Sequence, residues 1–340
     1  MTIRSPSLGY PAGAVPPDRN CPNLTAMRMC IMHPRLGDEL RAHLDGRLPG
    51  VTVDVVHDDR GDPPGFGRYD VLVANALPPG LLARGARLRW LQLTSVGTDQ
   101  LAAGRPRPGL IVTNAGAIPA RAVAEFALMG MLALAKEAPA LVRGHDARGW
   151  RLPDARLLAG GTLVQVGLGR VGTEIARRAR AFDMRVVGVT RTGRESAAAD
   201  LTVPAAALPD VARDADHLVV AVPGGDGTRG LVGARVVAAL PATACLINVA
   251  RPEVVDTAAV VAALRGGRLR GALLDVHDHE PLPSDSPLWS TRGLWVTPHA
   301  AFCYPGEAAD LADLIAGNLR RLREGGPLRN LVTAPAPAPR

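Results

Sequence analysis

The sequence predicts an α/β protein built from two Rossmann-like, doubly wound parallel sheets. Short apolar segments of strand length alternate with amphipathic segments of helix length, which is the pattern of parallel sheets covered by helices. A glycine-rich turn near the middle of the chain starts a second series of such segments. With 340 residues, the chain is long enough for two domains, each with its own hydrophobic core.

Composition and charge favour an ordinary globular protein with a small-molecule ligand. Hydrophobic residues make up 47% of the chain and charged residues 21%, as in typical globular domains. The net charge of +7 comes from scattered arginines, and only 3% of the residues are aromatic. Because nucleic-acid binding needs a clustered basic surface and stacking rings, we expect no nucleic-acid partner. A modest positive field can still attract a small anionic substrate.

The sequence has no signature of membrane insertion or secretion. We find no apolar run of about 18 residues, so we expect no membrane span. The first residues are rich in Pro and Gly and lack the apolar core of a signal peptide, so residues 1–25 are expected to be a disordered tail. The four cysteines show no metal-binding spacing, which predicts reduced thiols, no metal and a cytoplasmic location.

Two series of strands are expected, with one long helical segment between them. The first series has five strands, at residues 26–34, 50–58, 69–78, 89–94 and 109–115. Residues 118–150 are helical and apolar nearly all round at their start, which suggests burial between domains or subunits. The second series has six strands, at residues 162–167, 185–190, 214–223, 244–250, 270–276 and 293–299.

The end of the chain is expected to return to the first series of strands. Residues 306–325 form an amphipathic helix that should pack back on the first domain. Residues 330–340, rich in Pro and Ala, are expected to be a loose tail.

The segment VGLGRVG places Gly167, Gly169 and Gly172 in the G-x-G-x-x-G spacing. An expected strand precedes this turn and an unbroken helical segment follows it, which is the context of a dinucleotide-binding turn. Gly167 permits the tight turn, Gly169 lets the backbone approach a pyrophosphate, and Gly172 lets helix and strand pack closely. The free N–H groups at the start of the helix then face the pyrophosphate. The alternative is an ordinary strand-to-helix turn.

The end of the next strand indicates which dinucleotide is bound. In NAD sites an acidic residue about 20 residues after the glycine turn binds the ribose 2′-hydroxyl. Here the strand ends in Thr190, Arg191, Thr192 and, after a glycine, Arg194, with no acid among them. Two guanidinium groups and two hydroxyls suit a 2′-phosphate. The sequence therefore predicts that NADP (NADPH) is favoured over NAD, the alternative being that both arginines are ordinary surface residues.

Three chemically active side chains follow strands of the second series. Arg251 follows the strand at 244–250, Glu280 follows the strand at 270–276, and His299 ends the last strand. Ligands of open α/β sheets gather at the carboxyl ends of the strands. Each residue alone also fits a structural role, as a surface arginine, a turn residue or a hydrogen-bonded histidine. The three together predict a catalytic set.

The chain resembles the D-isomer-specific 2-hydroxyacid dehydrogenases, in particular the glyoxylate/hydroxypyruvate reductases. The matching segments, in the family's order, are SVGTD, VAEFAL, VGLGRVG, VPGGDGTRGLV, NVARPEVVD, LLDVHDHEPLP and VTPH. The resemblance implies a dinucleotide-binding domain at residues 118–299 and a discontinuous substrate domain at residues 26–117 and 300–332. It also implies a homodimer joined through the dinucleotide-binding domain.

The same resemblance implies an NAD(P)-dependent oxidoreductase that reduces a 2-keto acid to a (D/R)-2-hydroxy acid. The family's catalytic residues fall on Arg251, Glu280 and His299. Arg251 would hold the substrate carboxylate and polarise the ketone. His299 would give a proton to the new alkoxide, and Glu280 would fix the histidine tautomer. In the oxidative direction, neutral His299 would act as the base.

Further site residues are implied by the resemblance alone. The substrate carboxylate is expected to meet the backbone N–H groups of Val96 and Gly97 and the side chain of Asn75, which could equally be a plain turn cap. The remaining expected dinucleotide contacts are Arg170, Val171, Val222, Pro223, Thr228, Ala250, Arg251, Asp275, His299 and Ala301.

Several departures from the family leave the substrate's side chain open. Pro252 follows the catalytic arginine where glycine is usual, and Phe302 stands where a small residue is frequent. His277 and His279 replace a commoner aromatic or polar pair, and we interpret them as loop histidines. Two alternatives stay open: a phosphite- or phosphonate-type anion dehydrogenase on the same scaffold, and an NAD(H)-sensing, corepressor-like binding protein. The reaction direction and the choice between a dimer and a higher oligomer are also open.

Overall fold

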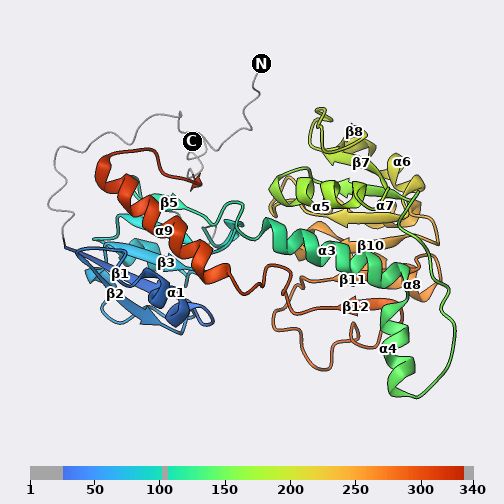
Figure 1. Ribbon diagram of the computed structural model, residues 1–340, viewed down its shortest axis with the longest axis horizontal. Helices are drawn as coiled ribbons and strands as arrows, with labels where there is room; N and C mark the ends of the chain where they lie inside the picture. Colours follow the sequence, from blue (N-terminus) through green and yellow to red (C-terminus); the bar gives the residue numbers. More distant parts are fainter. Residues whose placement is uncertain (1–25, 102–105, 333–340) are drawn as a thin grey trace. The chain divides into compact units, whose positions relative to one another are not determined.

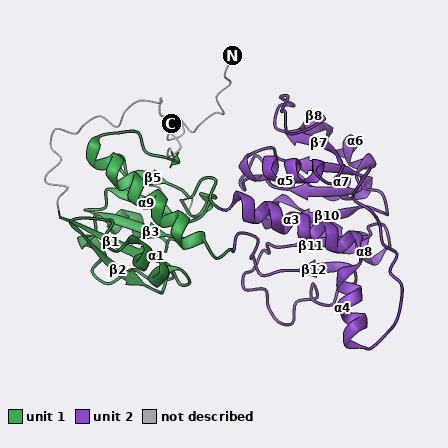
Figure 2. Ribbon diagram, viewed as in Figure 1, with its two compact units in different colours: residues 1–118, 304–340 green, residues 119–303 purple. Residues whose placement is uncertain are grey.

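The computed structural model describes residues 26–101 and 106–332, so the tail expected at residues 1–25 lies outside the described residues. The chain divides into two compact units (Figure 2). Unit 1 comprises residues 1–118 and 304–340, and unit 2 comprises residues 119–303. The assignment of unit 1 to the substrate and of unit 2 to the dinucleotide stays a prediction.

Unit 1 contains a six-stranded sheet in the order β13-β5-β4-β3-β1-β2 (Figure 1). β1 to β5 pair in parallel, and β13 pairs antiparallel with β5. The five strands expected in the first series are all present. The strands are β1 (Met27–Met32), β2 (Val51–Val56), β3 (Val71–Ala74), β4 (Trp90–Leu93), β5 (Ile111–Thr113) and β13 (Leu331–Val332).

Helices cover both faces of the unit 1 sheet. Alternate residues of β1 point to opposite faces, so Ile31 joins a core with α1 and α9 while Cys30 joins the core under α2. The helix expected at the end of the chain is α9, and it packs on α1 as predicted. The helical elements are α1 (Gly37–Leu44), η1 (Phe66–Arg68), α2 (Leu81–Arg84), η2 (Asp99–Leu101) and α9 (Glu307–Glu324).

Unit 2 contains a seven-stranded sheet in the order β12-β11-β10-β9-β6-β7-β8. All its pairings are parallel. The six strands expected in the second series are present, and β8 is an additional edge strand. The strands are β6 (Thr162–Val166), β7 (Arg185–Thr190), β8 (Leu201–Pro204), β9 (His217–Val220), β10 (Cys245–Asn248), β11 (Gly271–Leu274) and β12 (Leu294–Val296).

Two cores bury the two faces of the unit 2 sheet. Leu163 of β6 packs with α3 and α5, whereas its neighbour Val164 packs with α6, α7 and α8. Such double coverage explains why these strands read as continuous apolar runs. The helical elements are α3 (Ala120–Ala135), α4 (Ala138–Asp146), α5 (Arg170–Arg180), η3 (Ala205–Ala207), α6 (Leu208–Val211), η4 (Ala212–Asp214), α7 (Ala234–Ala239), η5 (Pro252–Val254) and α8 (Thr257–Arg265). The predicted fold class, two doubly wound α/β domains, is confirmed.

Two local expectations were wrong. The long helical segment breaks at Glu137, whose φ of 54° is left-handed, and becomes α3 and α4. Its apolar first part, α3, is buried against α5, β10 and β11 of its own unit. The expected loose tail begins instead with β13, because Leu331 and Val332 pair with Thr113 and Val112 of β5.

Candidate active site

The glycine turn between β6 and α5 has the geometry that its spacing predicted. Gly167 has a φ of 92°, and a Cβ there would lie 2.5 Å from the carbonyl oxygen of Ala221. A Cβ on Gly172 would lie 1.8 Å from the carbonyl oxygen of Gly167, so only glycine lets α5 pack so close to β6. Both positions therefore require glycine for reasons internal to the fold.

Gly169 differs from the other two glycines, because no heavy atom lies within 4 Å of the place that its Cβ would take. It is the N-cap of α5, and its φ of −75° is open to any residue. The open space therefore lies directly at the helix start, where Arg170 and Val171 form the first turn. An uncovered backbone at a helix N-terminus fits the pyrophosphate of a dinucleotide.

The segment after β7 is turned toward solvent. Thr190 ends β7, and its hydroxyl accepts a hydrogen bond from the N–H of Gly193 at 3.0 Å. Arg191, Thr192 and Arg194 follow on the exposed turn. The guanidinium groups are therefore accessible to a ligand at the carboxyl end of β7, next to the glycine turn that follows the neighbouring strand β6.

The loop after β9 lies against the glycine turn. Cγ1 of Val222 is 2.6 Å from the position of a Cβ on Gly167. Pro223 and Thr228 close this loop, because the Thr228 hydroxyl donates a hydrogen bond of 2.6 Å to the Pro223 carbonyl oxygen. Val222 therefore lies against the glycine turn, and the hydrogen bond from Thr228 closes the loop that carries Val222.

The loop that carries Arg251 is held by a residue that sequence reasoning missed. Asn248, the last residue of β10, is 1% exposed. Its side chain accepts a hydrogen bond from the Ala250 N–H at 3.0 Å and donates one to the Arg251 carbonyl oxygen at 3.1 Å. Arg251 also donates from Nη1 to the Ala250 carbonyl oxygen at 2.8 Å. A polar residue ending an apolar strand was the available signal for Asn248.

Asp275 organises the loop that carries His299. Its carboxylate is 1% exposed and accepts hydrogen bonds from the Thr297 hydroxyl at 2.7 Å, the Ala300 N–H at 2.9 Å and the Ala301 N–H at 3.0 Å. These bonds clamp both sides of His299, which itself adopts a left-handed φ of 52°. A non-glycine residue in this region is held there by its surroundings. The structure therefore assigns Asp275 a positioning role, in addition to the cofactor contact expected from the sequence.

Glu280 and His299 form the central pair of the site. Oε2 of Glu280 is 2.8 Å from Nδ1 of His299, and Oε1 accepts the backbone N–H of His277 at 2.9 Å. Partial burial by itself raises the pKa of Glu280, but the hydrogen bonds from His299 and His277 outweigh it and lower that pKa below its ordinary value. Glu280 is therefore an ionised acceptor at neutral pH, and it orients the Nε2 edge of the ring away from itself.

Arg251, Glu280 and His299 lie at one end of the sheet. They follow β10, β11 and β12, which are consecutive neighbours with parallel register. The structure therefore places the three loops at the same edge, as parallel strands must.

Phe302 contacts the ring of His299. Its ring centroid lies 5.8 Å from that of His299, with an angle of 79° between the planes. This edge-to-face geometry is favourable for aromatic pairs. The large residue noted at this position in the sequence therefore packs directly on the imidazole.

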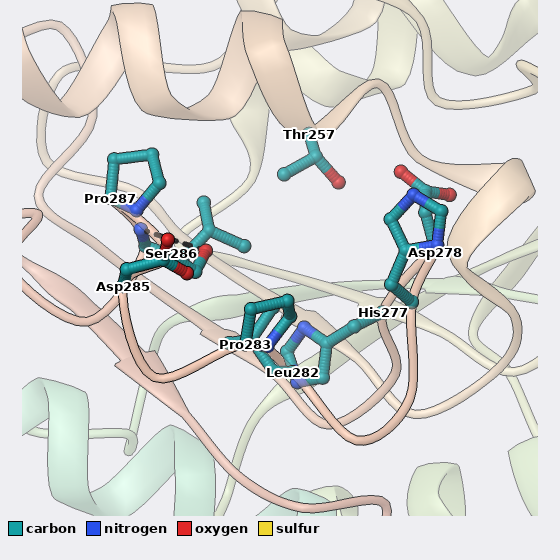
Figure 3. A pocket seen from close by; sticks show the side chains of 10 residues that line it. Thr257, His277, Asp278, Leu282, Pro283, Asp285, Ser286 and Pro287 are labelled. Carbon is teal, nitrogen blue, oxygen red and sulfur yellow. Dashed lines mark hydrogen bonds between the residues drawn. The ribbon is translucent and has the colours of Figure 1, made fainter.

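His277 and His279 lie in the loop after β11. His277 is buried, and its Nε2 is 2.9 Å from the carbonyl oxygen of Thr297. Both histidines line a cavity of about 360 Å³ between this loop and the start of α8, where Thr257 lies across from Leu282 and Pro283 (Figure 3). Within residues 26–101 and 106–332, no group of three or more His, Cys, Asp or Glu side chains could hold a metal ion.

The residues expected to bind the substrate carboxylate lie in unit 1. Asn75 follows β3, and its Oδ1 accepts a hydrogen bond from the Thr94 hydroxyl at 3.4 Å. The carbonyl oxygens of Val96 and Gly97 accept hydrogen bonds from the side chains of Asn114 at 2.8 Å and Ser95 at 2.9 Å. The loop is thus held through its carbonyl groups, an arrangement compatible with N–H groups directed at an anion.

The described cysteines Cys30, Cys245 and Cys303 are free thiols. No helix in the described part of the chain is long and apolar enough to cross a bilayer.

Comparisons with known proteins identify the family. The family model of the D-isomer specific 2-hydroxyacid dehydrogenase, NAD binding domain, matches residues 128–301. The chain is 33% identical over 273 residues to the glyoxylate reductase of Aeropyrum pernix, covering 77% of this chain and 81% of that protein.

Solved structures show the same similarity across nearly the whole chain. A D-isomer specific 2-hydroxyacid dehydrogenase from Xanthobacter autotrophicus Py2, solved with NADPH and MES, has a TM-score of 0.79 and 30% identity, covering 91% of this chain and 98% of that one. The NADPH-dependent glyoxylate/hydroxypyruvate reductase of Sinorhizobium meliloti, solved with NADP and sulfate, has a TM-score of 0.78 and 25% identity, covering 90% and 98%. The chain therefore belongs to the D-isomer specific 2-hydroxyacid dehydrogenase family, and it is an NAD(P)-dependent enzyme of that family.

Proposed function

We propose that this enzyme reduces a small 2-keto acid to a (D/R)-2-hydroxy acid and favours NADPH as the hydride donor. The observation that carries the proposal is the 2.8 Å hydrogen bond between Glu280 and His299, on loops that adjoin the loop of Arg251. An acid oriented by a carboxylate, with a guanidinium group on a loop at the same end of the sheet, supplies two things that ketone reduction needs. They are a proton for the alkoxide and a cation that binds the substrate carboxylate.

His299 acts as the general acid in this proposal. Its Nδ1 is engaged by Glu280, so the proton that reaches the substrate oxygen leaves from Nε2. The ionised Glu280 stabilises the imidazolium before transfer and holds the ring in one tautomer afterwards. In the reverse direction the neutral ring accepts the hydroxyl proton at the same atom.

Arg251 binds the substrate carboxylate and polarises the ketone oxygen. A guanidinium group presents several donors in a fixed plane, which suits adjacent carboxylate and carbonyl oxygens. Asn248 forms hydrogen bonds with the backbone of Ala250 and of Arg251, so the backbone that carries the guanidinium group is held in place. Asn75 and the N–H groups of Val96 and Gly97 are the further carboxylate-binding groups that we propose.

The dinucleotide, when bound, supplies the hydride that reduces the carbonyl carbon. The open backbone at Gly169 receives its pyrophosphate, and Val222, Pro223, Thr228, Ala250 and Ala301 form the proposed wall around the rest of the molecule. The exposed Arg191 and Arg194, with Thr190 and Thr192, bind the 2′-phosphate. NADPH and NADP in the two similar structures support this preference.

A small substrate such as glyoxylate or hydroxypyruvate fits best. Phe302 packs on His299 and so occupies space beside the proton donor. The relatives that are named glyoxylate reductases support the same size class.

The test is a spectrophotometric panel with purified protein. NADPH or NADH is offered with glyoxylate, hydroxypyruvate, pyruvate, phenylpyruvate, a branched keto acid and phosphonopyruvate, and loss of nicotinamide absorbance is followed. The proposal predicts turnover with glyoxylate and hydroxypyruvate and a higher kcat/KM with NADPH. Turnover only with the phosphonate would favour the anion-dehydrogenase alternative. Dinucleotide binding without any turnover would favour a binding protein.

We also propose that the enzyme is a homodimer joined through unit 2. The segment after α3 exposes large apolar side chains, among them Val142 (60% exposed), Trp150 (99%), Leu152 (85%) and Leu157 (74%). Monomeric proteins rarely expose such a contiguous apolar segment, and a second copy would cover it. Light scattering tests this: Trp150→Asp with Leu152→Asp should halve the particle mass, and an unchanged dimer mass would refute the interface.

A further inference from the structure

His277 links the two loops that carry Glu280 and His299. It lies in the loop after β11, and its side chain is buried. Nε2 of the ring is 2.9 Å from the carbonyl oxygen of Thr297, in the segment that leads directly to His299. The backbone N–H of His277 donates to Oε1 of Glu280 at 2.9 Å. One residue therefore contacts both Glu280 and the segment that carries its partner histidine.

The proton in the bond to Thr297 belongs to His277. A carbonyl oxygen can only accept a hydrogen bond, so Nε2 of His277 is the donor and carries the proton whether the ring is neutral or charged. An apolar ring would fill the same space without making this bond. The hydrogen bond is therefore the property that distinguishes histidine from an aromatic hydrocarbon side chain at this position.

Thr297 is a fixed partner for the His277 ring. Its N–H donates to the carbonyl oxygen of Leu274 at 3.1 Å, and its hydroxyl donates to Oδ1 of Asp275 at 2.7 Å. Both of these acceptors belong to the end of β11 or to the residue that follows it. Because Thr297 is held through its backbone and its side chain, the bond from His277 ties the loop of Glu280 to the sheet.

The carboxylate of Glu280 depends on such support, because its side chain is 37% exposed. An exposed carboxylate on a loop occupies several rotamers unless its neighbours restrict it. Here Oε1 is bonded to the His277 N–H, and Oε2 is bonded to Nδ1 of His299. The first of these bonds requires the backbone of His277 to stay in place, and the bond between the His277 ring and Thr297 restrains that backbone.

We propose that His277 is a positioning residue for proton transfer, an inference that rests on the proposed function. Its side chain holds the loop of Glu280 so that the carboxylate faces Nδ1 of His299. His277 acts through Glu280 and not on the substrate. Its loss should therefore slow the chemical step, whereas the binding of keto acid and dinucleotide, which other residues perform, should be unchanged.

Steady-state kinetics of two variants separate the hydrogen bond from packing. His277→Phe keeps a ring without a donor, and the cavity of about 360 Å³ that His277 lines (Figure 3) leaves space for one more ring atom. With the keto acid that the native protein reduces fastest, kcat should fall about tenfold, and the KM values for keto acid and NADPH should stay within about twofold. His277→Gln offers an amide N–H to the same carbonyl oxygen and should keep kcat within about twofold.

His279 provides the matched control. It is exposed, belongs to the same loop and lines the same cavity. His279→Phe should leave kcat and both KM values unchanged. Thermal unfolding shows whether each variant is folded. If His277→Phe does not fold, His277→Leu takes its place as a smaller side chain without a donor, and the same loss of kcat is expected.

A second measurement does not depend on turnover. Nitrogen–proton correlation NMR spectra of the histidine rings, recorded at a pH where the ring of His299 is neutral, report which ring nitrogen carries the proton. We expect His299 to be the Nδ1–H tautomer in the native protein and in His277→Gln, because ionised Glu280 accepts that proton. In His277→Phe the Nε2–H tautomer should appear as well. This pattern without turnover of any keto acid would refute the proposed function and still support the positioning of the Glu280–His299 pair by His277.

Three results would overturn the proposal. They are an undiminished kcat in His277→Phe, an equal loss of kcat in His277→Phe and His277→Gln, or the same tautomer of His299 in the native protein and in both variants. The first and third would show that the pair stays in place without the bond to Thr297. The second would show that the shape of the ring, and not its donor, is what the loop requires.

Discussion

Nδ1 of His299 and Oε2 of Glu280 lie 2.8 Å apart, although 19 residues separate them in the chain. Glu280→Gln keeps the size of the side chain but removes its negative charge. We expect kcat for keto-acid reduction to fall by about 100-fold, because a positioned acid and its orienting carboxylate contribute at least this much. The exposed Glu324→Gln serves as the control and should retain full activity. An unchanged kcat in Glu280→Gln would remove the pair from the mechanism.

The same pair predicts a pH dependence. Hydrogen bonds to Glu280 lower its pKa. The ionised carboxylate therefore contributes its full stabilisation of the folded protein above the ordinary glutamate pKa of 4.5. It is lost only as the pH falls through the lower pKa of the folded protein. Reduction should therefore keep its rate down to the pH at which this carboxylate gains a proton. Glu280→Gln should not show this loss of rate at low pH, because the amide side chain gains no proton there. Rate–pH profiles of both proteins test this.

Gly172 and Gly169 should respond differently to the same substitution. Gly172→Ala forces a Cβ to 1.8 Å from a backbone oxygen, and should destabilise unit 2 by about 3 kcal/mol. Gly169→Ala meets no atom within 4 Å, so stability should change by less than about 0.5 kcal/mol. The added methyl group should still weaken dinucleotide binding by about tenfold. Thermal unfolding and dinucleotide titration distinguish the two effects, and a stable Gly172→Ala would contradict the packing argument.

Arg191 and Arg194 should determine the choice of dinucleotide. In Arg191→Ala/Arg194→Ala, loss of charge-assisted hydrogen bonds of about 2 kcal/mol should raise the KM for NADPH by roughly 30-fold. The KM for NADH should stay within about twofold, because NADH lacks the 2′-phosphate. Arg213→Gln/Arg235→Gln, at two exposed arginines of the same unit, controls for the loss of two positive charges. Equal changes in both KM values would show that the two arginines do not read the phosphate.

Phe302 should limit the size of the substrate. Phe302→Ala removes the ring that packs on His299, so kcat for glyoxylate should fall about two- to tenfold through loss of the aromatic contact. At the same time, the KM for phenylpyruvate should decrease, since space opens beside the proton donor. Phe182→Ala, an exposed phenylalanine after α5, is the matched control. If the KM for phenylpyruvate does not decrease in Phe302→Ala, Phe302 lies outside the substrate pocket.

His217 should make unit 2 sensitive to acid. Burial lowers the pKa of His217 from 6.5 to about 4, so the unfolded chain binds a proton that the folded chain does not. Stability is therefore full above pH 6.5 and falls as the pH drops toward 4, by about 2 kcal/mol at pH 5. Since Nδ1 of His217 has no hydrogen-bond partner among the described residues, His217→Leu should remove this loss. Urea unfolding at pH 7.5 and pH 5 measures the free energy of unfolding of the native protein and of His217→Leu. An equal loss of stability at pH 5 in the two proteins would show that His217 is not its cause.

Much of the fold was predictable because it depends on local patterns. The strands of both series are short apolar runs between turns, and each was located from the sequence. β8 was missed because Leu201–Pro204 is a partly exposed edge strand without a clear apolar pattern. β13 was missed because two residues pair only where β5 offers a free edge. The break between α3 and α4 depends on the left-handed backbone of one residue, Glu137, which an otherwise helical pattern does not reveal.

The sequence by itself determined the glycine turn and the positions of the strands of both series along the chain, and it singled out Arg251, Glu280 and His299 as candidates, because these features depend on neighbours within a few residues. Only the tertiary structure decided which groups meet. In the structure, Asp275 forms hydrogen bonds with the loop of His299, and Asn248 forms hydrogen bonds with the backbone of Ala250 and Arg251. The physical reason is that hydrogen bonds depend on distances in space, and parallel strands bring together residues whose separation in the chain carries no local signal.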